Sequence, residues 1–133
     1  VIFRDVEEDA ITVDENISIT NSEFWFCNDK CIQMNRANKA TITNNKFYYT
    51  TSAVLANYGY NITVNSNTFY KTKKAIRART NNSLVKASGN KHTEGDCMLS
   101  AQDKGRLEDW GNNTASNVKN KICEINGGKV SIK

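Results

Sequence analysis

The strongest constraint on the fold is a sequence pattern that returns about every 22 residues along the chain. Residues 17–24, 40–47 and 62–69 repeat it in full, and residues 85–92 form a weaker fourth copy. A period this short has room for two or three strands and their turns, but not for a helix as well. The pattern therefore predicts a β-solenoid, in which each turn of the chain stacks on the turn before it.

A second strand pattern lies between these copies. Side chains alternate faces along a strand, so every second residue points to the same side. Two columns of this kind face inward: Ile11, Ile32, Val54, Ile76 and Met98, and, two residues later, Val13, Met34, Ala56, Ala78 and Ser100. They predict a continuous core from turn to turn. We expect an all-β, right-handed parallel β-helix of about five to six coils, each of about 22 residues.

The corners of the expected coils carry two further columns. Phe24, Phe47 and Phe69 predict an aromatic stack, in which His92 is the next member and is expected to be a packed residue. A polar column at the turn comprises Ser22, Asn45, Asn67, Asn90 and Asn112. Because Asn tolerates left-handed backbone and can bond to its own kind in the next coil, this column predicts an Asn ladder.

The repeat fades towards the C-terminus. We assign residues 1–104 to the coils and residues 105–133 to an irregular last coil or C-terminal cap of the same domain. The first residue, Val1, falls inside an expected strand, and no amphipathic capping helix is evident there. We therefore expect a mature product, or a part of a longer chain or fibre.

Charge narrows the possible partners. The formal net charge is +4, and five cations fall close together, namely Lys71, Lys73, Lys74, Arg77 and Arg79. Clustered cations can bind phosphate, but an acidic cluster near the N-terminus would share their surface, so nucleic acid is not expected. An acidic polysaccharide uses both clusters better. No segment is long and apolar enough to span a membrane, so no membrane partner is expected either.

The four cysteines allow two disulfides. Cys31 and Cys97 share a column three coils apart, too far to bond to each other. Cys97 and Cys123 are expected in neighbouring coils and can pair, and Cys27 and Cys31 can close a tight corner loop. Two disulfides suit a secreted, extracellular protein.

A functional face is expected on the outward side of the second strand, where stacked strands form a straight groove. Its outward residues are Thr12, Asp14, Gln33, Asn35, Leu55, Asn57, Arg77, Arg79, Leu99 and Ala101. Carboxylates, then amides, then cations follow one another along this face. We interpret Gln33, Asn35, Asn57 and Arg79 as substrate-binding groups of the groove.

Two segments resemble a known family. The run Phe3-Arg-Asp-Val-Glu-Glu-Asp-Ala-Ile-Thr12 is similar to the aromatic-x-Asp-Val-x-Glu-Asp-Ala-x-Thr stretch of the small pectate lyases of polysaccharide lyase family 3. The run Asp29-Lys-Cys-Ile-Gln-Met-Asn35 resembles that family's Asp-Lys-x-x-Gln-x-Asn segment. The similarity covers residues 1–45, and the family is itself a short right-handed parallel β-helix.

The resemblance implies calcium-assisted β-elimination on polygalacturonate or a related acidic polysaccharide. Calcium would bind at Glu8, Asp9 and Asp29, which match the family's acidic region, and would acidify the sugar C5 proton. Lys30 matches the lysine of the Asp-Lys pair. Lys30, Lys74 and Arg77 are therefore the candidate catalytic residues, one removing the proton and another stabilising the enolate-like intermediate.

The sequence also departs from that family. Its Lys-x-x-Arg motif is expected one coil after Asp-Lys, where this chain has Ser52 and Leu55; Lys74 and Arg77 have the right spacing one coil later. Two other functions therefore stay open. One is a catalytically inactive β-helical module that binds carbohydrate or builds a fibre, and the other is a structural segment of a larger surface protein.

Overall fold

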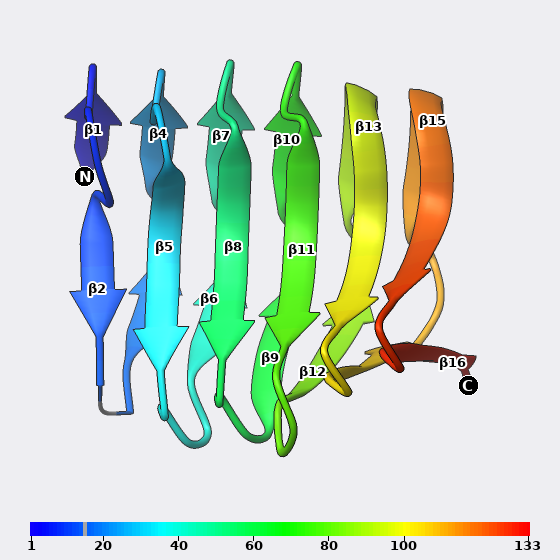
Figure 1. The fold of residues 1–133 in the computed structure, drawn as a ribbon. Helices are drawn as coiled ribbons and strands as arrows, with labels where there is room; N and C mark the ends of the chain where they lie inside the picture. Colours follow the sequence, from blue (N-terminus) through cyan, green and yellow to red (C-terminus); the bar gives the residue numbers. More distant parts are fainter. Residues whose placement is uncertain (15) are drawn as a thin grey trace.

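The computed structural model describes residues 1–14 and 16–133, and the chain winds into a parallel β-helix of about six turns. In Figure 1 the front strands point down, the rear strands point up, and the chain advances from left to right, which makes the winding right-handed. The predicted fold class is confirmed. Within the described residues, no helix is long and apolar enough to cross a membrane.

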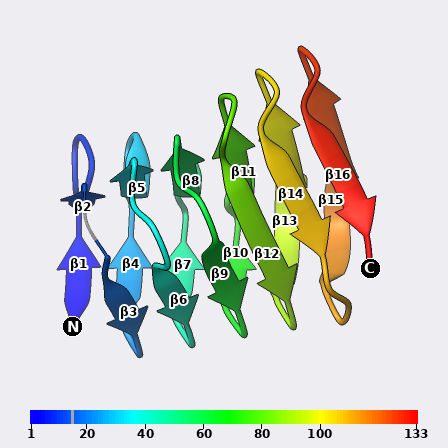
Figure 2. The same ribbon diagram turned by 90° about the horizontal axis from the view of Figure 1, so that it is seen from below.

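Each of the first four turns contributes one strand to each of three faces (Figures 1 and 2). The β1 face comprises β1 (Ile2–Arg4), β4 (Glu23–Trp25), β7 (Lys46–Tyr48) and β10 (Thr68–Tyr70). The β2 face comprises β2 (Ile11–Val13), β5 (Lys30–Asn35), β8 (Ser52–Asn57) and β11 (Lys74–Arg79). The β3 face comprises β3 (Ser18–Thr20), β6 (Thr41–Thr43), β9 (Ile62–Asn65), β12 (Leu84–Ser88), β14 (Arg106–Asp109) and β16 (Lys129–Ile132).

Two long strands join the first two faces at the C-terminal end. β13 (Lys91–Gln102) pairs in parallel with both β10 and β11, and β15 (Thr114–Ile125) pairs with β13 along most of its length. The β1 and β2 faces are therefore one ten-stranded sheet, and the β3 face is a separate six-stranded sheet.

The expected core columns are present, with one shift of register. Ile32, Val54 and Ile76 are register partners and are fully or almost fully buried. In the next coil, however, Ile76 pairs with Leu99, and not with the predicted Met98. Met98 is buried one position earlier.

The cause of this shift is one additional residue in the turn between β11 and β12. Ala56 pairs with Ala78 at a spacing of 22, whereas Ile62 pairs with Val85 at a spacing of 23. Leu99 and Ala101, predicted to point outward, therefore point inward, and Ser100, predicted to point inward, takes the outward position beside Arg77.

The aromatic column forms the predicted stack and extends it by one residue. The ring centroids lie 4.9 Å apart for Phe3 and Phe24, 4.8 Å for Phe24 and Phe47, and 5.0 Å for Phe47 and Phe69. His92 continues the column as a fully buried side chain, edge-on to Phe69, with Nε2 2.7 Å from the Thr72 carbonyl oxygen. It is a packed residue, as expected.

The Asn ladder is present, but its last member is Asn113, where Asn112 was predicted. Asn67 Oδ1 accepts from the backbone N–H of Asn45 at 2.9 Å, and Asn113 Oδ1 accepts from that of Asn90 at 3.1 Å. The left-handed residue is the one before each ladder position, and Asn112 is such a residue, with φ of 57°. Its side chain is exposed, so it cannot belong to the buried ladder.

The expectation of an irregular last coil or cap at residues 105–133 is wrong, because this segment is regular. It contains β14, β15 and β16, which pair in register with the preceding coils. Leu107 and Val130 are register partners in the inward column, so the coil geometry continues although the sequence repeat has faded. Strands pair through their backbones, whatever their side chains. The last coils can therefore form even though their sequences no longer show the repeat.

Both expected disulfides are confirmed. Cys27 pairs with Cys31 across the β4–β5 corner, with a Cα–Cα distance of 5.4 Å. Cys97 and Cys123 join β13 to β15, with a Cα–Cα distance of 6.4 Å.

Candidate binding face

The outward residues of the β2 face form rows that run from coil to coil. One row holds Gln33, Leu55, Arg77 and Ser100 as successive register partners. The next holds Asn35, Asn57, Arg79 and Gln102. Because parallel strands lie about 4.8 Å apart, each row presents one side chain per coil at a regular distance. Apart from Leu55, these two rows place polar side chains at regular intervals along the face.

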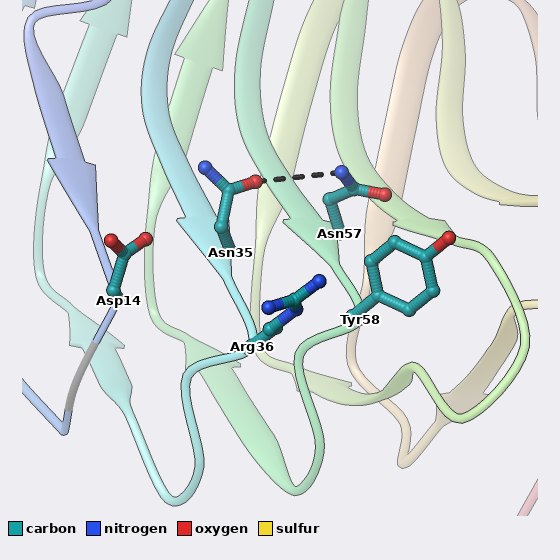
Figure 3. A pocket seen from close by; sticks show the side chains of 5 residues that line it. All are labelled: Asp14, Asn35, Arg36, Asn57 and Tyr58. Carbon is teal, nitrogen blue, oxygen red and sulfur yellow. Dashed lines mark hydrogen bonds between the residues drawn. The ribbon is translucent and has the colours of Figure 1, made fainter.

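The structure brings the four predicted substrate-binding residues into one hydrogen-bonded network. Asn35 Oδ1 accepts from Gln33 Nε2 at 3.0 Å. It also accepts from Asn57 Nδ2 at 3.4 Å (Figure 3). Asn57 Oδ1 in turn accepts from Arg79 Nε at 3.4 Å. All four side chains are half-buried. The network fixes the orientation of these side chains relative to one another.

A hollow of about 300 Å³ lies at the end of this network. Asp14, Asn35, Arg36, Asn57 and Tyr58 line it, as Figure 3 shows. The Arg36 guanidinium carbon lies 6.0 Å from the centroid of the exposed Tyr58 ring. The hollow therefore combines one carboxylate, two amides, one guanidinium and one aromatic ring.

Arg36 and Tyr58 were not predicted as site residues. Each follows the outward Asn at the end of its strand, and each has a left-handed backbone, with φ of 62° and 58°. Their spacing of 22 residues was the available signal, because it places them at the same corner of neighbouring coils. Strand parity cannot find them, since alternation ends where the strand ends.

Arg77 is a half-buried cation in the middle of the face. Nη1 lies 3.4 Å from Ser52 Oγ, and Nη2 lies 3.4 Å from Gln102 Oε1, so the guanidinium bridges from one coil to two others. Burial lowers the pKa of Arg77, and the charge of Arg79 lowers it further, whereas Asp29 raises it. The side chain is thus held at the centre of the face by contacts with both neighbouring coils.

Leu55 explains how this part of the face is built. It is fully buried although its row points outward. Its register partners on either side are Gln33 and Arg77, whose long side chains can cover an apolar neighbour while their polar ends reach solvent. Leu55 therefore packs beneath the side chains of Gln33 and Arg77.

Lys30 is held in ion pairs. Its ammonium nitrogen lies 2.7 Å from Asp29 Oδ2 and 3.5 Å from Asp9 Oδ1. Asp9 Oδ2 also accepts from Thr12 Oγ1 at 3.3 Å. The lysine is mostly enclosed, with 18% of its side chain exposed. Its ammonium is therefore engaged by two carboxylates and is not free to approach a substrate proton.

The three candidate catalytic residues do not all converge. Lys74 and Arg77 lie on the same strand, β11, and Lys74 is exposed at its start. Lys30 and Lys74 both pair with Ser52, from opposite sides of β8. They are therefore two strand spacings apart, about 10 Å.

The predicted calcium ligands do not form a carboxylate cluster. Asp9 and Asp29 have the Lys30 ammonium between them, and Glu8 is exposed in the segment between β1 and β2. Residues 1–14 and 16–133 contain no group of three or more His, Cys, Asp or Glu placed to hold a metal ion. Calcium takes six to eight oxygen ligands, so this arrangement does not fit a calcium site.

Comparison with known proteins leaves the family open, because no family model matches the chain and no curated protein or solved structure matches it.

Proposed function

We propose that the β2 face binds an extended acidic polysaccharide, and that binding rather than cleavage is its main role. The observation that carries the proposal is the network that joins Gln33, Asn35, Asn57 and Arg79 across three coils. In such a network the polar groups are oriented before the ligand arrives, so less conformational entropy is lost on binding.

The chemistry of the face suits a uronate polymer. Arg77 and Arg79 offer guanidinium groups, which pair well with carboxylates. The amides of Asn35 and Asn57 can bond to sugar hydroxyls. The exposed Tyr58 ring, at the rim of the hollow, can pack against the apolar side of a sugar ring.

β-Elimination is a second candidate, supported by the enclosed Arg77 and by the resemblance to family 3 pectate lyases. A lowered pKa is the direction that a guanidine base requires. The base would take the C5 proton, the C–H electrons would form the C4–C5 double bond, and the C4–oxygen bond would break. The leaving oxygen would take a proton from solvent water. The ion-paired Lys30 and the dispersed carboxylates argue against this route.

Calorimetry with polygalacturonate, together with ultraviolet absorbance to detect the unsaturated product, tests both functions. Titrations with added calcium and with chelator show whether calcium contributes. We expect saturable binding that weakens with salt and no gain in absorbance. Absorbance that rises with time and is lost in Arg77→Lys would instead establish the lyase.

A neutral control strengthens the test. Fully methyl-esterified polygalacturonate has the same backbone without the charges, and we expect it to bind at least tenfold more weakly. No binding of polygalacturonate by protein shown to be folded by circular dichroism would overturn the proposal.

A further inference from the structure

A second hollow lies on the β3 face, away from the proposed polysaccharide site. Its volume is about 300 Å³, and Thr63, Lys86, Ser88 and Trp110 line it. Thr63 and Lys86 are register partners on β9 and β12. Trp110 directly follows β14 and donates its backbone N–H to the Ala87 carbonyl at 2.8 Å, which places it beside Ser88 in the preceding coil. The hollow forms because the short side chain of Ser88 lies beside the large ring of Trp110.

The orientation of Trp110 is set by a residue of β14, the strand that precedes it. Its Nε1 donates to Glu108 Oε1 at 3.0 Å. Glu108 also lies 3.6 Å from the Lys133 ammonium, which offsets its charge. The indole is nevertheless 53% exposed, unusually open for a tryptophan.

Trp25 makes the same indole–glutamate hydrogen bond, but its ring is covered by other side chains. Its Nε1 donates to Glu23 Oε1, also at 3.0 Å and also two residues earlier. Its ring, however, stacks on Tyr48 at 4.1 Å and lies under the Arg4 guanidinium at 5.0 Å. In the part of the chain that the structure describes, Trp110 has neither a ring partner nor a cation over its face. It is a fixed aromatic platform without a partner.

We propose that this hollow binds one pyranose unit that carries a carboxylate, stacked on the open face of Trp110. An aromatic face suits the apolar side of a sugar ring, and a few placed polar groups give orientation. The hydroxyls of Thr63 and Ser88 hydrogen-bond to the sugar hydroxyls. Lys86, which makes no ion pair with any described residue, pairs with the carboxylate. The site is separate from the β2 face and does not depend on its function.

Tryptophan fluorescence can test the proposal directly, because the chain has two tryptophans. Trp25→Phe leaves Trp110 as the only indole, and Trp110→Phe leaves Trp25 as the matched control. The probes are digalacturonate and its uncharged counterpart, digalactose. We expect digalacturonate to change the Trp110 signal saturably and to leave the Trp25 signal unchanged.

Charge recognition is tested in the Trp25→Phe background. Lys86→Met should weaken digalacturonate binding about tenfold, as expected for the loss of about 1.4 kcal/mol. Arg79→Gln, on the other face, should leave the Trp110 response unchanged, so this site and the β2 face can fail independently. An unchanged Trp110 signal, an equal response to digalactose, or full affinity in Lys86→Met would each overturn the proposal.

Discussion

The ammonium of Lys30 lies 2.7 Å from the carboxylate of Asp29, its neighbour in sequence. This pair, completed by Asp9 from the preceding coil, joins a candidate base to two candidate metal ligands. Charges that neutralise one another hold a corner together more readily than they bind a metal or remove a proton. The charges of this corner are paired with one another, whereas the neighbouring amides and guanidinium groups form a hydrogen-bonded network on the open face.

Lys30→Met should therefore reduce stability and leave polysaccharide binding almost unchanged. The buried Asp9 Oδ1 accepts no hydrogen bond from a described residue, so removing the ammonium takes away its ion-pair contact and costs about 1–3 kcal/mol. Urea denaturation measures the loss, and calorimetry with polygalacturonate measures the affinity. A tenfold or greater loss of affinity with unchanged stability would place Lys30 in the binding site after all.

Arg79→Gln should show the reverse behaviour. Loss of a hydrogen bond to a charged group costs about 1.5–3 kcal/mol, so affinity for polygalacturonate should fall by about tenfold or more. Stability should change little, because the side chain is only half-buried. Arg106→Gln, which removes an exposed charge from the β3 face, is the matched control. Equal losses in both variants would mean that net charge alone governs binding.

Asn67→Ala should be among the most destabilising substitutions in the chain. Its Oδ1 accepts from the Asn45 backbone, and its Nδ2 donates to the Ile42 carbonyl at 2.9 Å. The truncation removes the partners of two backbone groups in β6 and the β6–β7 turn of the preceding coil, with an expected cost of about 2–4 kcal/mol by urea denaturation. Asn44→Gly, at the exposed left-handed position, should cost less than about 0.5 kcal/mol.

His92 should make stability depend on pH. Burial lowers its pKa below the ordinary value of 6.5, against smaller raising effects from the Thr72 carbonyl and Asp96. Below pH 6.5 the unfolded chain then binds more protons than the folded chain, so stability falls as pH falls towards the folded pKa. Above pH 6.5 this contribution is fully present.

Thermal unfolding measured in steps through this pH window tests the expectation. His92→Leu should be less stable overall, since it loses the contact with Thr72, but its stability should vary less with pH. The same slope in both proteins would assign the pH dependence to other groups.

The two disulfides should contribute unequally. Cys97 and Cys123 are 26 residues apart, and closing a loop of that length stabilises by about 3.5 kcal/mol in the chain-entropy account. Cys27 and Cys31 are 4 residues apart, for which the same account predicts about 2 kcal/mol. Denaturation of the two double Cys→Ala variants compares them. A larger loss for Cys27 and Cys31 would show that their corner depends on the bond for its geometry.

Much of this protein follows from its sequence alone. The period of about 22 residues predicts the β-helix, because only stacked strands fit so short a repeat. The alternation along the second strand predicts that Gln33, Asn35, Asn57 and Arg79 share a face, because strand parity is a local property. Errors begin where the spacing between neighbouring coils changes from 22 to 23 residues, as with Leu99 and Asn113, since an added turn residue shifts the register that a constant period predicts.

The tertiary structure decided what each side chain meets in the next coil. Lys30 has the sequence context of a catalytic residue, yet stacking places Asp9 beside it and completes an ion pair. Trp25 and Trp110 share the same local pattern, a glutamate two residues earlier, yet one ring is covered and the other is open. The difference lies in the neighbouring coils, where Tyr48 stacks on Trp25 but the short Ser88 lies beside Trp110. Local sequence determines orientation, whereas contacts between coils determine whether a group is structural or free to bind.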